Sequence, residues 1–141
     1  MRLNPLFKEE VFRAMGEHAL KMCYQCGKCS SFCPLFNLNS HKFNPRRIIE
    51  MVNIGAEDVL KSEEIWKCTT CYECAENCPQ QLNFVELIVF LRTKATEKGY
   101  APKILLQELE LVRKEGFSVP MSPRTKKWIE SNFKKEEVNN E

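Results

Sequence analysis

Apolar residues along the chain are spaced three and four positions apart, and no segment alternates convincingly between apolar and polar residues. Spacings of three and four place side chains on one face of a helix, whereas strict alternation would predict a strand. The longest apolar stripes lie in residues 84–98 and 103–115. The pattern therefore predicts an all-α protein.

Two asparagine–proline pairs mark predicted helix starts. Asparagine is a favoured capping residue, and proline is favoured at the first helical position. The pair at residues 4–5 begins a predicted helix whose apolar face continues as far as Met22, next to the first cysteine. The pair at residues 44–45 begins a second helix, which we expect to end at Gly55 because glycine commonly follows a helix.

The second half of the chain contains the most apolar predicted helix, residues 84–98. Asn83 is its expected cap and Gly99 its expected stop, and apolar residues cover most sides of its first half, so this helix should be buried. The other predicted elements are short helical turns in residues 56–60 and 62–66 and two later helices in residues 103–115 and 124–131.

We expect a single α-helical domain over residues 1–133. It comprises a core over about residues 20–99 and C-terminal docking helices over about residues 102–132. Residues 134–141 are charged and have few apolar side chains to bury, so they are expected to form a disordered tail.

Two cysteine runs separate the helical segments, CYQCGKCSSFCP at residues 23–34 and CTTCYECAENCP at residues 68–79. Both have the spacing C-x₂-C-x₂-C-x₃-C-P, which indicates an internal duplication. Eight cysteines in 141 residues are too many to be explained as unbonded thiols. We therefore expect them to bond to metal or to each other.

The spacing is that of bacterial ferredoxins with two clusters, in which the fourth cysteine of each run ligates the other cluster. We therefore predict two [4Fe–4S] clusters. The predicted ligands of the first cluster are Cys23, Cys26, Cys29 and Cys78, and those of the second are Cys68, Cys71, Cys74 and Cys33. Phe32 and Trp66 flank these ligands and are expected to shield the clusters from water.

Zinc and disulfides are the competing explanations for the cysteines. Structural zinc favours separated C-x₂-C pairs that complete one tetrahedral site, and it leaves the third cysteine and the proline of each run unexplained. A disulfide framework is disfavoured in the cytoplasm, where we expect the protein because its N-terminus has no apolar leader and no twin-arginine pair. Its longest apolar stretch, residues 82–91, contains Glu86 and is too short to span a membrane.

Composition and missing motifs narrow the function further. The formal net charge is +2, and the lysines and arginines are scattered, so no nucleic-acid-binding surface is indicated. The sequence contains no glycine-rich nucleotide motif, no ninth cysteine and no histidine–carboxylate set for acid–base chemistry. The chemistry that remains is the storage and transfer of electrons.

Three segments, CYQCGKCSSFCP, NPRRIIEMVNIGAEDVL and IWKCTTCYECAENCP, resemble the C subunit of heterodisulfide reductase. The resemblance covers roughly residues 20–115, although the second run continues as CPQQL where the family has a CPRGV-like sequence. It implies an α-helical ferredoxin fold with two [4Fe–4S] clusters.

The resemblance also implies partners and a role. Electrons would pass from the family's flavin-containing iron–sulfur A subunit to its catalytic B subunit, which carries CCG motifs and reduces the CoM-S-S-CoB heterodisulfide. The complex would be of the methanogen type and would form a dimer of heterotrimers. No Cys-Cys-Gly occurs here, so we expect a non-catalytic electron-transfer subunit of that oxidoreductase. The alternatives are a homologous subunit of a sulfur-metabolism complex and a free, soluble ferredoxin that shuttles between partners.

Overall fold

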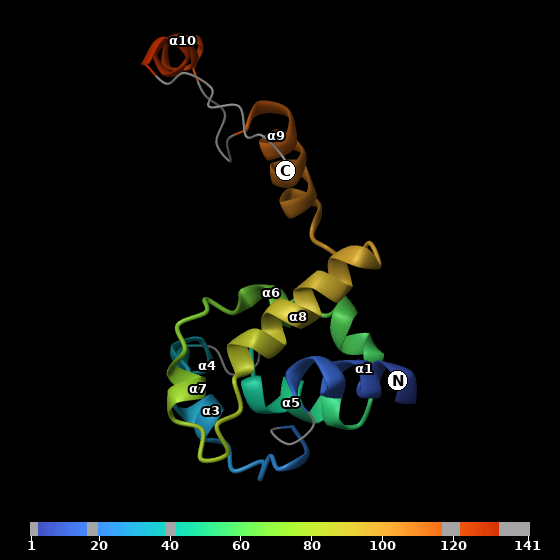
Figure 1. Ribbon diagram of the computed structural model, residues 1–141. Coiled ribbons are helices and arrows are strands. Elements are labelled where there is room, and N and C mark those ends of the chain that lie inside the picture. Colours follow the sequence, from blue (N-terminus) through green and yellow to red (C-terminus); the bar gives the residue numbers. More distant parts are fainter. Residues whose placement is uncertain (1–2, 17–19, 39–41, 117–121, 133–141) are drawn as a thin grey trace. The chain divides into compact units, whose positions relative to one another are not determined.

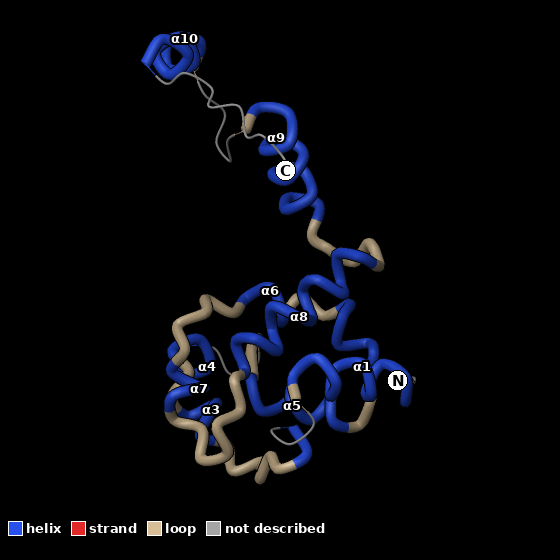
Figure 2. Tube along the Cα trace, viewed as in Figure 1, coloured by secondary structure: helices blue, strands red, loops and turns tan. Residues whose placement is uncertain are grey.

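A computed structural model describes residues 3–16, 20–38, 42–116 and 122–132 of the chain (Figure 1). Within these ranges Figure 2 shows helices and loops without a β-strand. The all-α prediction is confirmed. The α-helices are α1 Pro5–Met15, α3 Lys28–Ser31, α4 Pro34–Leu38, α5 Pro45–Asn53, α6 Glu64–Lys67, α7 Glu73–Glu76, α8 Phe84–Glu97, α9 Lys103–Glu115 and α10 Pro123–Asn132, with a 3₁₀ helix, η1, at Glu57–Lys61.

Three asparagine side chains cap the helices that the sequence predicted to begin there. The Asn4 Oδ1 accepts hydrogen bonds from the backbone nitrogens of residues 6 and 7 at 3.1 and 3.3 Å. Asn44 and Asn83 each accept one from the backbone nitrogen three residues later, at 3.3 Å in both cases. These bonds satisfy donors that the first turn of a helix leaves without an intrahelical partner.

The first helix is shorter than its apolar pattern predicted. It ends at Met15, because Gly16 follows with a φ of 79° that turns the backbone out of the right-handed helical region. Met22, expected on the buried face, is 42% exposed. The apolar spacing alone therefore predicted a longer helix than the structure contains.

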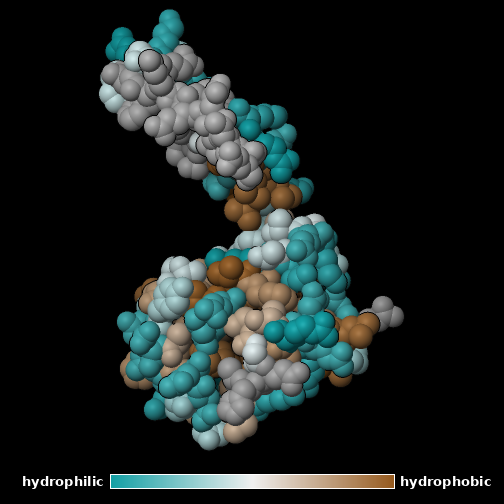
Figure 3. Space-filling model, viewed as in Figure 1, coloured by the Kyte–Doolittle hydropathy of each residue, from teal (hydrophilic) through white to brown (hydrophobic). Residues whose placement is uncertain are grey.

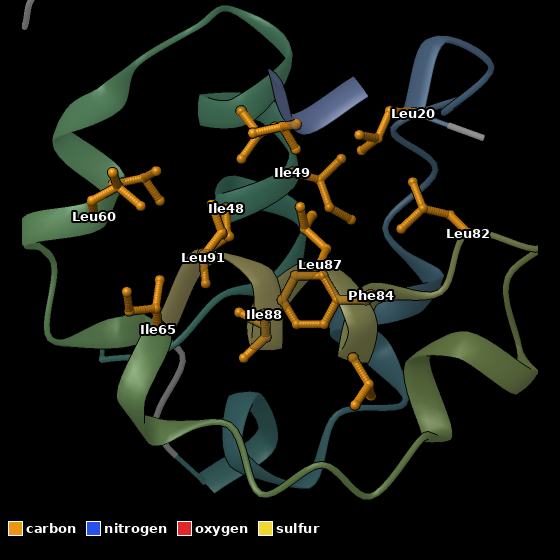
Figure 4. Packing of buried hydrophobic residues seen from close by; sticks show 14 of the residues in the cluster. Leu20, Ile48, Ile49, Leu60, Ile65, Leu82, Phe84, Leu87, Ile88 and Leu91 are labelled. Carbon is orange, nitrogen blue, oxygen red and sulfur yellow. The ribbon is translucent and has the colours of Figure 1, made fainter. Parts of the chain in front are cut away.

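The core surrounds α8. This helix contacts α1, η1, α6 and α7, and six of its side chains are buried: Phe84, Val85, Leu87, Ile88, Leu91 and Ala95. Figure 4 shows four of them, the labelled Phe84, Leu87, Ile88 and Leu91, in one buried cluster with Ile48 and Ile49 of α5. The prediction that this helix is the buried one is confirmed, and its first turn follows directly on the second cysteine run.

The chain divides into two compact units, Met1–Ala101 and Pro102–Glu141. All eight cysteines and every buried apolar side chain among the described residues belong to the first unit. In the second unit α9 and α10 begin and end close to the predicted positions, and Figure 3 shows hydrophobic residues at the surface of α9. The predicted tail, residues 134–141, lies outside the described residues, and the docking role of these helices stays a prediction.

None of the described helices combines the length and the apolar character that a membrane crossing needs.

Candidate metal centre

The cysteines line two hollows in the first unit. The first hollow is lined by Cys23, Cys26, Cys29, Cys78 and Cys74, and the second by Cys33, Cys68, Cys71 and Cys74. Each hollow thus combines the first three cysteines of one run with the fourth cysteine of the other. Cys74 contributes to the walls of both hollows.

Contact between the short helices α3 and α7, one from each run, brings the two runs together. The two backbones also turn at equivalent positions. Gln25 and Thr70, two residues after the first cysteine of their runs, have φ values of 54° and 55°. Gly27 and Tyr72, four residues after it, have φ values of 83° and 65°. Successive turns of this kind can direct backbone N–H groups toward an anion such as a thiolate-ligated cluster.

The third cysteine of each run lies in its short helix, where Cys29 is partly buried and Cys74 is buried. Burial, together with the smaller effect of the nearby thiols of the same hollows, raises the pKa of the Cys74 thiol to about 12. Burial likewise raises the pKa of Cys29, with smaller contributions from Cys23 and Cys78 in the same direction and an opposing hydrogen bond from Ser30. A thiol must lose its proton to bind iron, so these positions favour the proton unless a metal replaces it.

Cys68, the first cysteine of the second run, also has its pKa raised in part by a cysteine of the other run. Burial raises the pKa of Cys68, and Cys71 and Cys33 add to the rise, while a hydrogen bond from the Thr70 backbone and the charge of Arg92 oppose it. Cys33 and Cys74 are each 7% exposed, whereas Cys26 and Cys71 are exposed. The second cysteine of each run therefore marks the place where its hollow reaches the surface.

Apolar side chains complete the walls. Phe84, at the start of α8, lines both hollows and is almost fully buried. Ile49 and Leu82 line the first hollow, and Phe43 and Val85 line the second. A sulfur-rich donor set inside apolar walls fits an iron–sulfur cluster, whose potential depends on exclusion of water.

The aromatic residues expected to shield the clusters are not those that the structure brings to the hollows. Phe32 is 48% exposed, and neither Phe32 nor Trp66 lines either hollow. Sequence reasoning missed Phe84. Its position as the first residue of the most apolar helix, directly after the second run, was the available signal.

Arg92 of α8 binds the backbone where the second cysteine run begins. Its Nε donates to the Ile65 carbonyl and its Nη2 to the Cys68 carbonyl, both at 2.7 Å. Its guanidinium also lies 5.9 Å from the centroid of the Trp66 ring. Cys68 is thereby fixed to the most buried helix of the unit.

Within the described ranges no three cysteine, histidine, aspartate or glutamate side chains are grouped closely enough to hold a single metal ion. The sulfurs are instead distributed around the two hollows.

Comparisons with known proteins agree with this chemistry. Residues 19–82 match the 4Fe-4S dicluster domain family, which accounts for both cysteine runs and gives two iron–sulfur clusters. The chain is 38% identical over 132 residues to the C2 subunit of the H₂/formate:CoB-CoM heterodisulfide,ferredoxin reductase of Methanococcus maripaludis. That alignment covers 89% of this chain and 71% of the relative.

Two further relatives carry related names. The iron–sulfur C subunit of the CoB–CoM heterodisulfide reductase of Methanopyrus kandleri is 34% identical, with 96% of this chain and 73% of the relative aligned. The C subunit of the ferredoxin:CoB-CoM heterodisulfide reductase of Methanosarcina mazei is 35% identical, with 84% and 71% aligned. Since identity above 30% extends over more than two thirds of these proteins, the chain belongs to the family of heterodisulfide reductase C subunits.

Proposed function

We propose that this protein is the electron-transfer subunit of a heterodisulfide reductase-type complex. In this proposal it relays electrons through two [4Fe–4S] clusters from a flavin-containing A subunit to a CCG-motif catalytic B subunit, which reduces the CoM-S-S-CoB heterodisulfide. The names of its relatives support the type of complex. The arrangement of the two hollows supports the relay.

The observation that carries the proposal is the mixed origin of the cysteines in each hollow. We assign Cys23, Cys26, Cys29 and Cys78 to the first cluster and Cys68, Cys71, Cys74 and Cys33 to the second. Exchange of the fourth ligand places both clusters in one rigid unit, because neither run can move without disturbing both sites.

When bound, the clusters supply one-electron uptake and release. The protein's own residues hold them and control their surroundings. The eight thiolates fix the clusters, and Phe84 and Cys74, which belong to both hollows, form a shared wall between them. The apolar walls exclude water, which lowers the cost of moving an electron because fewer solvent dipoles must reorient.

The chain contains no CCG motif, and the described residues provide no further thiol, so we assign it no substrate chemistry of its own. We place it in the cytoplasm as part of a hetero-oligomer with the flavin-containing and catalytic subunits. The helices α9 and α10 are its proposed docking elements, since α9 presents Ile104, Leu106, Leu109 and Val112 to its surface.

Anaerobic affinity purification from the native cells tests this proposal. We expect a flavoprotein with iron–sulfur motifs and a CCG-motif protein to co-purify with the chain, and the purified complex to reduce CoM-S-S-CoB. Recovery of the chain alone, monodisperse and with its clusters, would contradict the proposal in favour of a soluble shuttle. Recovery with sulfur-metabolism enzymes, without activity on the heterodisulfide, would contradict the assigned substrate.

A further inference from the structure

The two cysteine runs turn at equivalent positions, and one of the positions at which their side chains differ lies two residues after the first cysteine. Two residues after that ligand, the first run has Gln25 and the second has Thr70, with φ values of 54° and 55°. The Thr70 hydroxyl donates to the Thr69 carbonyl at 2.7 Å. The Gln25 Nε2 instead lies 3.6 Å from the Cys23 Sγ and donates toward it.

The orientation of the Gln25 amide follows from its other partner. Arg46 donates from its Nε to the Gln25 Oε1 at 3.3 Å. A guanidinium has only donors, so the amide oxygen must face Arg46 and the NH₂ group must face the sulfur. Gln25 and Arg46 both line the first hollow, so the contact lies at the proposed cluster site.

Ser30, which is 6% exposed, connects Arg46 to the first run. The Ser30 Oγ accepts a hydrogen bond from the Arg46 backbone nitrogen at 3.3 Å and donates to the Asn44 Oδ1 at 2.9 Å. Ser30 is the residue after Cys29, so these bonds join the first turn of α5 to the ligand-bearing helix α3. These two hydrogen bonds therefore hold the Arg46 backbone against the first run, which contains Gln25.

We infer that Gln25 and Arg46 are positioning residues that raise the reduction potential of the first cluster through an Arg46–Gln25–Cys23 chain of hydrogen bonds. The inference rests on the proposed function, in which Cys23 ligates that cluster. An N–H donor to a ligating sulfur stabilises the reduced cluster more than the oxidised one, because the reduced cluster carries one more negative charge. In the second run the equivalent hydroxyl is bonded to a backbone carbonyl, and the described side chains that line the second hollow are uncharged.

The test is a potentiometric titration of the loaded, full-length protein, followed by EPR. A Cys26→Ser variant identifies the signal of the first run's cluster. In Gln25→Leu, which removes the donor at similar volume, we expect the potential of that cluster to shift downward and that of the other cluster to stay unchanged. Thr70→Val, the matched change in the second run, should shift neither potential. Iron and sulfide contents must equal those of the unaltered protein before potentials are compared.

Two variants separate the effect of the Arg46 hydrogen bond from the effect of its charge. Arg46→Lys keeps the charge but lacks the directed Nε–H, so we expect it to lower the potential of the first cluster as Arg46→Met does. In the Gln25→Leu background, Arg46→Met should cause a smaller further shift than it does alone, because the two residues act through one contact. A wild-type potential in Arg46→Lys would show that Arg46 acts only as a charge and would overturn the proposed chain of bonds.

Gln25→Glu provides a second test if the leucine variant loads poorly. Its carboxylate can still bind Arg46 but has no N–H to donate, so the potential should again fall. An unchanged potential in a fully loaded Gln25 variant overturns this inference and leaves the proposed function intact. Absence of clusters from the unaltered chain would instead overturn the proposed function itself.

Discussion

Cys33 and Cys78 are the residues on which the proposed ligand exchange depends. Each follows the short helix of its own run but lies in the hollow of the other. We predict that Cys33→Ser perturbs the cluster of the second run more than that of its own run, because a serine oxygen is a poor substitute for a thiolate ligand. Cluster-resolved EPR of the reduced protein measures this.

The reciprocal variant is the control. Cys78→Ser should perturb the cluster of the first run, and the two variants should therefore affect opposite signals. If each variant altered only the signal of its own run, the fourth ligand would not be exchanged and the proposed ligand sets would have to be rearranged.

Gln81 is a non-glycine residue with a φ of 54°, three positions after Cys78. Because a Cβ atom disfavours the left-handed region, we predict that Gln81→Gly raises the free energy of unfolding by roughly 0.5–1 kcal/mol. Anaerobic denaturant unfolding measures the change. Gln80→Gly is the matched control and should lower stability, since Gln80 has no positive φ to relieve.

At the residue scale, the spacing predicted which cysteines share a hollow but not which other side chains surround them. The positions of the eight cysteines follow a rule that depends on the shape of a cluster and hardly on the rest of the fold. Phe84 and Arg46 reach the hollows from the first turns of α8 and α5. The spacing of the cysteines does not contain their approach, because that approach depends on how α5 and α8 pack.

Glu57 connects three elements of the first unit. The Asn4 side chain at the start of α1 donates to its Oε2 at 2.6 Å, and Lys98 after the end of α8 binds its other oxygen. The hydrogen bond from Asn4 and then that from Lys98 hold the pKa of the Glu57 carboxyl below its ordinary value of 4.5. We predict that Glu57→Gln lowers the free energy of unfolding at pH 7 by about 1 kcal/mol.

The effect of Glu57 should depend on pH. A carboxyl with a lowered pKa in the folded state stabilises fully above its unfolded pKa and loses that contribution as the pH falls through the folded value. The difference between the wild type and Glu57→Gln should therefore shrink below about pH 4.5. Glu9→Gln, an exposed change on α1, should show a much smaller difference at both pH values. A difference for Glu57→Gln that stays constant down to pH 3 would contradict this account.

Arg92 joins α8 to α6 and to Cys68, the first cysteine of the second run. Removal of its guanidinium leaves two backbone carbonyls without their charged donor. We predict that Arg92→Met lowers the free energy of unfolding by about 2–3 kcal/mol and reduces occupancy of the second cluster before the first. Unfolding curves and iron content measure these effects. Lys94→Met on the same helix, where the partners are the surface residues Glu10 and Glu97, should leave both clusters occupied.

At the element scale, the helices that begin at an asparagine cap were predictable, whereas the short helices inside the cysteine runs were not. Asparagine caps act within three residues, so α1, α5 and α8 begin as predicted. The helices α3 and α7 have four residues each, little more than one helical turn, so they are too short to show an apolar stripe. Each follows a residue of its cysteine run with a left-handed backbone conformation. The end of α1 was missed because a glycine outweighed an apolar pattern that continued beyond it.

At the scale of the whole molecule, the first unit contains everything that the proposed clusters require. The eight cysteines, the walls of both hollows and the core around α8 all lie before residue 102. In the second unit α9 contains no buried residue among those described, and four of its apolar side chains are exposed. Exposed apolar residues along one helix are typical of a protein-binding surface.

We therefore predict that a chain ending at Ala101 retains the iron and sulfide content of the full protein but no longer captures its partner proteins. The full chain carrying Leu106→Lys and Leu109→Lys should bind its partners more weakly, because each charge would have to be buried in the proposed interface. Gln107→Lys and Glu108→Lys together form the matched control on the same helix. Loss of clusters from the shortened chain would show that α9 and α10 stabilise the cluster unit, and undiminished capture of the partners would place the docking surface on the first unit.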